Sequence, residues 1–346
     1  MFTDRRSNST TTKRKRQAWP KDKPFKILSL DGGGIRGIFG ACLLNKMQQN
    51  YGAGEHLSRY FDLIAGTSTG GIIAIGLGLQ IPTEKIEMLY MLGGKKIFPP
   101  FWTRFKIARF LKSLFMSLHN HKELESALKK NFEDKLFGES KARLVIPSFL
   151  GPKAEIAVFK TDHHPDIKHD WKTEAWKIAR STSAAPTFLQ AMESNEGVQR
   201  KRDKKYFLDG GVWANNPIMS AIVDAMSSYD IELEQIKVLS IGTGNSAPSV
   251  SKRGLRGGLV TWKKIISTAM FLTTDNALGQ AGLLIGPENI LRLEPDKVNS
   301  DIELDDWYRA RMSLPNDADR TFTENADSIA GFFSETVASR EAHYCN

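Results

Sequence analysis

The residue in this chain whose surroundings most clearly suit it to react is a serine with a glycine two positions before it and another two positions after it. Ser68 is the centre of a Gly-Thr-Ser-Thr-Gly segment at residues 66–70. Where such a segment forms the turn between a strand and a helix, it exposes the serine hydroxyl as a nucleophile. A serine hydroxyl attacks poorly until a base takes its proton, so a second residue must act with it. We therefore expect acyl-transfer chemistry at Ser68 if a base lies within reach.

The best candidate for that base is Asp209, which begins an Asp-Gly-Gly segment after another apolar run. A Ser-His-Asp triad in the α/β-hydrolase order needs a histidine after the acid. Only His343 follows Asp209, and we expect it to lie in a frayed tail. A carboxylate can take the serine proton without imidazole when the bound substrate excludes water. The sequence therefore predicts a Ser68–Asp209 dyad.

A glycine-rich loop at residues 31–37, Asp-Gly-Gly-Gly-Ile-Arg-Gly, could stabilise the charge that develops in this reaction. It follows a predicted buried strand at 25–30 and precedes a predicted helix at 38–48. Backbone N–H groups at the start of a helix favour negative charge. That charge could be a tetrahedral oxyanion. Arg36 could add a positive charge or could brace the loop by bonding carbonyl groups.

The same loop also has the Gly-x-Gly-x-x-Gly spacing of dinucleotide-binding proteins, through Gly32, Gly34 and Gly37. That fingerprint expects an acidic residue where the second strand ends. Here the second strand ends on the Ser68 segment, and Asp62 lies at its other end. A P-loop is excluded because no Gly-Lys-Ser/Thr follows. Nucleotide binding by the loop remains the alternative to an oxyanion site.

Alternating strand-like and helix-like runs must position these segments. An apolar run at 60–65 predicts a strand before Ser68, and the run at 71–79 predicts a helix after it. Further strands are predicted at 143–146, 155–159, 206–208, 236–241 and 289–293. The chain has 346 residues, 41% of them hydrophobic, which is enough for one large core. We predict a single three-layer α/β/α domain over residues 25–346, with a central, mostly parallel sheet.

Basic residues are concentrated in two regions of this chain of formal net charge +9. Residues 1–26 hold nine Lys or Arg and two acidic residues, so residues 1–24 are predicted to be a disordered tail. It could attract anionic lipid or nucleic acid, or only aid solubility. Residues 98–115 combine phenylalanines with Lys and Arg at helical spacing. Such a helix could lie in a membrane interface, cover the cleft or contact another subunit.

The remaining features indicate a cytoplasmic protein whose chemistry needs no metal. Residues 161–169 contain His163 and His164 but lack ligand spacing on a defined element, so we predict a solvated loop. A disulfide between Cys42 and Cys345 is not expected. No apolar run approaches the length of a membrane span, and the first residues lack a signal-peptide core. We expect the protein to meet lipid from the cytoplasmic side.

Three of these segments, in this order, resemble the motifs of the patatin-like phospholipases: residues 31–37, 66–70 and 209–211. Residues 179–188 and 214–217 are also similar to that family, and the resemblance covers roughly residues 25–245. It implies a patatin-like fold and lipid acyl hydrolysis, with Ser68 as nucleophile and Asp209 as base. The oxyanion site that it implies consists of Gly32, Gly33, Gly34 and Arg36.

Along its whole length the chain also resembles bacterial patatin-like effectors of cyclic-oligonucleotide antiphage signalling, through its size and the runs at 289–295 and 302–306. In that subfamily a cyclic dinucleotide activates a phospholipase that degrades the cell's own membrane. The resemblance implies membrane phospholipid as substrate at the inner face, a cyclic dinucleotide as activator, homo-oligomers on activation, and no DNA or RNA partner. The alternatives are a constitutive lipase and a nucleotide-binding regulatory protein whose hydrolase motifs are relics.

Overall fold

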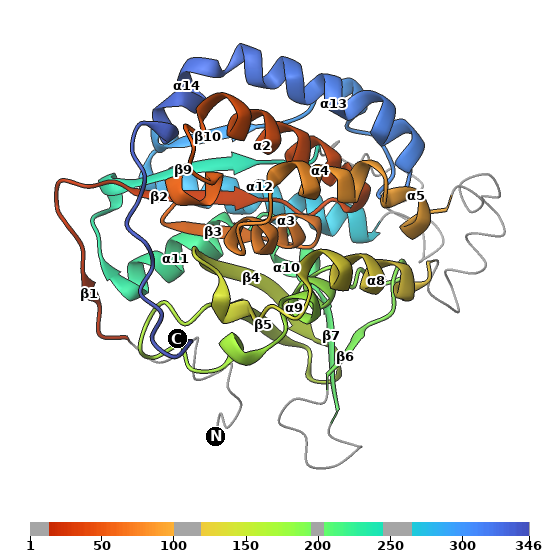
Figure 1. Ribbon diagram of the computed structural model, residues 1–346, viewed down its shortest axis with the longest axis horizontal. Coiled ribbons are helices and arrows are strands. Elements are labelled where there is room, and N and C mark those ends of the chain that lie inside the picture. The colour runs from red at the N-terminus through yellow and green to blue at the C-terminus, as the bar shows by residue number, and fades with distance from the viewer. Residues whose placement is uncertain (1–13, 100–118, 195–203, 245–264, 346) are drawn as a thin grey trace, which may run out of the picture.

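The computed structural model describes residues 14–99, 119–194, 204–244 and 265–345 as a sheet covered by helices on both faces (Figure 1). The eight strands of the sheet are β2 (Phe25–Leu30), β3 (Leu63–Gly66), β4 (Arg143–Leu150), β5 (Glu155–Lys160), β6 (Met192–Ser194), β7 (Lys205–Asp209), β9 (Ile236–Ile241) and β10 (Ile290–Leu293). Their order is β10-β9-β2-β3-β4-β7-β6, with β5 also paired to β4. The five strands from β10 to β4 are parallel, which confirms the predicted α/β class.

Helices on the two faces bury alternate residues of each strand, as a period of two requires. In β2, Leu28 and Leu30 belong to the core on one face, whereas Phe25 and Ile27 belong to the core on the other. The first face is covered by α2 (Gly37–Tyr51), α3 (Thr69–Gly78), α4 (Thr83–Met91), α8 (His121–Phe132), α9 (Ala175–Thr182) and α13 (Trp307–Glu324). The second face is covered by α11 (Ile218–Ser228) and α12 (Ile265–Ile285). This arrangement is the predicted three-layer architecture.

The pairing along β4 brings two strand ends together. Residues Arg143–Val145 of β4 pair with β3 in parallel, and Ser148–Leu150 pair with the antiparallel β7. Because β5 pairs with the opposite edge of β4 from Val145 to Leu150, which overlaps both stretches, β3 and β7 must share one edge. Their carboxyl ends therefore approach each other head-on. The residues that follow β3 and end β7, Ser68 and Asp209, meet at this point.

Two predictions about the chain ends are wrong in the described residues. The predicted disordered tail included residues 14–24, but β1 (Gln17–Ala18) pairs with β8 (Tyr229–Asp230). Trp19 also packs on the ring of Phe25 at a centroid distance of 4.8 Å. At the other end the backbone N–H of His343 donates to the backbone oxygen of Asp162. Backbone pairing and aromatic packing hold these segments in place.

One strand boundary differs from prediction, and some predicted features lie outside the described residues. The strand predicted from residue 60 begins at Leu63, because Leu57–Tyr60 form a short 3-10 helix. Nearly all of the predicted amphipathic helix at 98–115 lies outside the described residues, as does the first part of the tail. Within the described residues, no helix is both long and apolar enough to cross a membrane.

Candidate active site

Ser68 lies on a strained turn between β3 and α3. Its backbone has φ 56° and ψ −120°, a conformation that costs a non-glycine residue about 1–3 kcal/mol. The flanking glycines permit the close approach of strand and helix: a Cβ on Gly66 would lie 2.7 Å from the backbone nitrogen of Gly71. The turn has the strand-to-helix geometry of a nucleophile elbow, as the spacing of the motif predicts.

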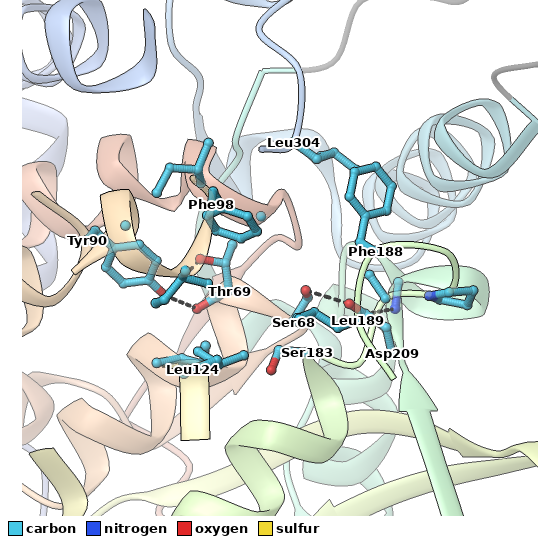
Figure 2. A pocket seen from close by; sticks show the side chains of 18 of the residues that line it. Ser68, Thr69, Tyr90, Phe98, Leu124, Ser183, Phe188, Leu189, Asp209 and Leu304 are labelled. Carbon is cyan, nitrogen blue, oxygen red and sulfur yellow. Dashed lines mark hydrogen bonds between the residues drawn. The ribbon is translucent and has the colours of Figure 1, made fainter. Parts of the chain in front are cut away.

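The serine hydroxyl donates a hydrogen bond to the carboxylate of Asp209, as Figure 2 shows. Ser68 Oγ lies 2.6 Å from Asp209 Oδ2, and both side chains are almost fully buried. Asp209 Oδ1 accepts a hydrogen bond from the backbone N–H of Gly211 at 2.7 Å, which orients the carboxylate. Ser68 and Asp209 are 141 positions apart in the sequence and were predicted to act together. They are in direct contact.

The protonation of Asp209 is set mainly by burial. Removal from water raises the pKa of this carboxyl group to about 6. The hydrogen bonds from Ser68 and Gly211 and the charge of the buried Arg180 oppose that rise. Asp209 is consequently ionised at neutral pH while remaining basic enough to accept a proton. A base with these properties suits general base catalysis.

A hydroxyl on α9 holds the backbone of Ser68 in place. Thr182 Oγ1 accepts a hydrogen bond from the backbone N–H of Ser68 at 3.0 Å and donates one to the carbonyl of Pro147 at 2.6 Å. It thereby joins the elbow to β4. Thr182 lies within residues 179–188, which the sequence marks only by a family resemblance, and no local pattern predicts this role for it.

Hydrogen bonds hold the glycine loop after β2 in place. They engage some, but not all, of the four groups that the sequence predicts as oxyanion donors. The N–H of Gly32 donates to the carbonyl of Asn215 at 2.9 Å. The guanidinium of Arg36 donates to the carbonyls of Gly33 and Gly244. Both groups thus brace the loop. Among the described residues no acceptor is paired with the N–H groups of Gly33 and Gly34, the other two predicted donors.

An arginine on β10 anchors the beginning of this loop. Arg292 donates two hydrogen bonds to the carboxylate of Asp31, from Nη1 to Oδ1 at 3.0 Å and from Nη2 to Oδ2 at 2.6 Å. Asp31 is buried and is the residue directly before Gly32. A bidentate pair fixes orientation as well as distance. Arg292 could not be predicted from the sequence as a partner of Asp31, since 261 positions separate the two residues.

Ser68 and Asp209 line a pocket with mainly apolar walls (Figure 2). Its apolar lining consists of Ile35, Ile72, Leu89, Ile97, Phe98, Leu124, Ala185, Pro186, Phe188, Leu189, Val212, Met270 and Leu304. Such a surface suits a hydrocarbon chain better than a polar substrate. No histidine is found among the described residues that line the pocket.

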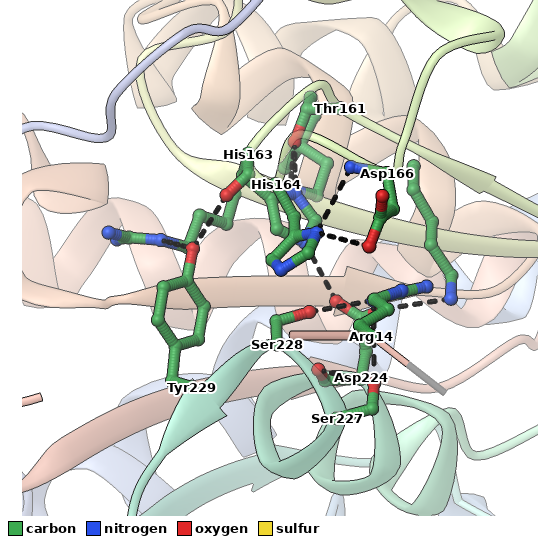
Figure 3. A network of polar contacts seen from close by, with 12 residues as sticks. Arg14, Thr161, His163, His164, Asp166, Asp224, Ser227, Ser228 and Tyr229 are labelled. Carbon is green, nitrogen blue, oxygen red and sulfur yellow. Dashed lines mark hydrogen bonds and ion pairs between the residues drawn. The ribbon is translucent and has the colours of Figure 1, made fainter. Parts of the chain in front are cut away.

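Two of the histidines of residues 161–169, His163 and His164, belong to a buried polar network and not to the predicted solvated loop (Figure 3). His163 Nε2 lies 2.8 Å from Asp224 Oδ2. Arg14 and Lys160 contact the other oxygen of Asp224 at 2.9 and 2.7 Å. Burial lowers the pKa of His163 to about 4. The solvated-loop prediction is wrong for His163 and His164 because α11 and the segment before β1 cover them.

In the described part of the chain no cluster of three or more His, Cys, Asp or Glu could hold a metal ion.

Comparison with known proteins identifies the family of this chain. Residues 28–222, more than half of the chain, match the family described as Patatin-like phospholipase. The chain belongs to the patatin-like phospholipase family. The match includes the glycine loop, Ser68 and Asp209, and membership makes the protein a phospholipase-type hydrolase. The α/β/α architecture is that of this family.

Relatives cover most of the chain. A "cGAMP-activated phospholipase" of Escherichia coli strain TW11681 is 31% identical over 82% of this chain and 85% of its own. One of the same name from Vibrio cholerae is 30% identical over 89% and 94%. Arabidopsis thaliana "Patatin-like protein 2" is 32% identical over 72% and 66%. Among solved structures, VipD from Legionella pneumophila is similar with a TM-score of 0.41 and 13% identity, over 89% of this chain and 67% of that one.

Proposed function

We propose that this protein hydrolyses the acyl ester bonds of membrane phospholipids with a Ser68–Asp209 dyad, and that a cyclic dinucleotide activates it for antiphage defence. The observation that carries the catalytic part is the 2.6 Å hydrogen bond between Ser68 Oγ and Asp209 Oδ2 beside a pocket with apolar walls. The hydrogen bond supplies an activated nucleophile, and the apolar walls accommodate the fatty acyl chain.

In the first half of the reaction, Ser68 Oγ attacks the ester carbonyl carbon while Asp209 takes the hydroxyl proton. The carbonyl oxygen becomes an anion, which the N–H groups of Gly33 and Gly34 stabilise. Each such donor contributes on the order of 3 kcal/mol to the transition state. When the tetrahedral intermediate collapses, the bond to the leaving alcohol breaks and Asp209 returns the proton to that oxygen. The lysophospholipid leaves, and the acyl group stays on Ser68.

In the second half, water replaces the alcohol. Asp209 takes a proton from the water as its oxygen attacks the acyl carbon, and the same amides hold the second oxyanion. The ester bond to Ser68 then breaks, the serine oxygen recovers a proton through Asp209, and the fatty acid is released. One carboxylate thus serves both steps, as its pKa near 6 permits.

The nucleotide control is supported by the names of similar proteins. Three proteins named "cGAMP-activated phospholipase" are 29–31% identical to this chain over 74–89% of its length. We propose by analogy that a cyclic dinucleotide shifts the protein into its active state, that activation involves homo-oligomers, and that the substrate is cell-membrane phospholipid at the cytoplasmic face. A ligand activates only if it binds the active state more tightly than the inactive state.

The test is fatty-acid release from phospholipid vesicles, with and without cyclic GMP–AMP. We expect little release without nucleotide, strong release with it, and no release from Ser68→Ala under either condition. An increase in particle size on adding nucleotide is expected from the oligomers. Full release without nucleotide, unchanged by adding it, would leave a constitutive lipase. Release by Ser68→Ala equal to wild type would refute the dyad.

A further inference from the structure

A second cavity lies at the end of the sheet opposite to Ser68. It has a volume of about 630 Å³, within the range of about 300–1,000 Å³ usual for small-molecule sites. The amino ends of β2, β9 and β10 form one of its walls. The lining residues there are Lys26, Lys237 and Ile290, each at the first or second position of its strand. Residues 19–24 and 328–338 supply further walls. We call it the amino-edge cavity.

We propose that the amino-edge cavity binds the activating cyclic dinucleotide. This inference rests on the nucleotide control proposed above and gives it a location. Such a ligand presents two phosphodiester anions, two flat bases and the hydrogen-bonding edges of those bases. The lining of the cavity offers a partner for each of these three features.

Three lysines of the cavity are candidates for the phosphate groups: Lys23, Lys26 and Lys237. Lys26 is buried, and its Nζ donates to the backbone oxygens of Phe332 at 3.0 Å and Glu335 at 2.7 Å. Lys237 donates to the side chain of Asn289. These contacts hold the two ammonium groups at the wall. A lysine ammonium has three donors and can keep such a contact while it binds a phosphate oxygen.

The carboxylates of the cavity can accept hydrogen bonds from the N–H groups on the edge of a nucleotide base. Asp62, Glu288 and Glu335 line it, and Asp62 is only 2% exposed. Asp62 Oδ2 accepts a hydrogen bond from the backbone N–H of Lys26 at 2.8 Å. The other oxygen has no donor among the described residues. A carboxylate oxygen accepts the N–H groups that guanine presents on its Watson–Crick edge. Mixed charges therefore favour a ligand with both anionic and donor groups over a simple anion.

Two aromatic side chains provide surfaces for the bases. Trp19 and Phe332 both line the cavity and are half-buried. Trp19 is supported from behind, because its ring contacts Phe25 and Tyr229 at centroid distances of 4.8 and 5.6 Å. Stacking of a base on an aromatic side chain contributes about 1–3 kcal/mol and tolerates any base. The ring of Trp19 is thus held in place before a ligand arrives.

Two elements connect the amino-edge cavity to the catalytic residues. In β10, Leu291 lines the cavity, and the next residue, Arg292, holds Asp31 at the start of the glycine loop. In α12, the backbone oxygen of the last residue, Ile285, accepts a hydrogen bond from Asn289 of the cavity. The same helix places Met270 in the acyl pocket. A ligand that repositions either element changes the oxyanion loop or the acyl pocket.

Calorimetric titration with cyclic GMP–AMP tests the location. We expect Lys237→Ala to weaken binding roughly tenfold or more, since it removes a charged hydrogen-bond donor. Lys130→Ala, an exposed change on α8, is the matched control and should bind as wild type does. If wild type binds and Lys237→Ala binds with the same affinity, the cavity is not the site. If wild type does not bind, both the nucleotide control and its location are refuted.

Hydrogen exchange of the wild-type protein gives a second measurement that does not depend on a variant folding. Saturating cyclic GMP–AMP should slow amide exchange at least several-fold in residues 287–291 and 328–338, which line the cavity. Residues 121–132 of α8 serve as the internal reference. Slowed exchange elsewhere, with none in the two cavity segments, would overturn the assignment while leaving nucleotide activation intact.

Discussion

The raised pKa of Asp209 predicts a specific effect of pH on stability. In the folded protein this pKa is about 6, against an ordinary value of 3.8. Each pKa unit corresponds to about 1.4 kcal/mol, so the ionised carboxylate destabilises the fold by about 3 kcal/mol. Between these two pKa values the folded state binds more protons at Asp209 than the unfolded state does. The free energy of unfolding therefore falls as pH rises through this window.

An Asp209→Asn variant removes this titration while keeping the shape of the side chain. We expect the unfolding free energy of Asp209→Asn, minus that of wild type, to increase by about 2–3 kcal/mol between pH 4 and pH 7. Urea unfolding followed by tryptophan fluorescence at four pH values measures it. Asp327→Asn, at an exposed position of α14 (Ala326–Ala330), controls for the substitution itself. A difference that does not vary with pH would refute the reasoning.

The same carboxylate must be ionised to act as base, so activity provides an independent check. Hydrolysis of a fluorogenic fatty ester by wild type should rise with pH through a midpoint near 6 in kcat/KM. Asp209→Asn should lose almost all turnover although it folds at least as stably at neutral pH. Retention of a tenth of wild-type turnover by Asp209→Asn, or a pH-rate profile that is flat from pH 5 to pH 8, would exclude Asp209 as the base.

Three further predictions concern the loop and the tail. Gly33→Val should abolish ester hydrolysis, because even a Cβ at this position would lie 2.5 Å from the Cβ of Thr243; normal kinetics of the folded variant would rule out this loop as the oxyanion site. Arg292→Met should lower the unfolding free energy by about 3 kcal/mol and reduce kcat, since it leaves the buried Asp31 unpaired; Arg292→Lys should recover part of both losses in the same assays. His343→Ala should leave kcat and KM unchanged, and a tenfold loss of kcat would point to a histidine-dependent mechanism.

Local sequence determined the elements and the chemical types at the site. The apolar runs at 25–30 and 236–241 predict strands because both faces of a central parallel strand are buried. The glycines around Ser68 predict the elbow, because only residues without a side chain allow a strand and a helix to approach so closely. The absence of a suitable histidine after Asp209 indicated the dyad. These inferences needed only spacing and residue type.

Tertiary structure decided which of the predicted groups meet and which are already engaged. Ser68 contacts Asp209 because β3 and β7 share one edge of β4 and run toward each other, and no pattern in either segment encodes that pairing. The same holds for Arg292, which reaches Asp31 only through the order of β10, β9 and β2. The sequence around a hydrogen-bond donor such as Arg36 does not show which group accepts its hydrogen bonds. Long-range strand order, not local propensity, brings Ser68 to Asp209 and Arg292 to Asp31.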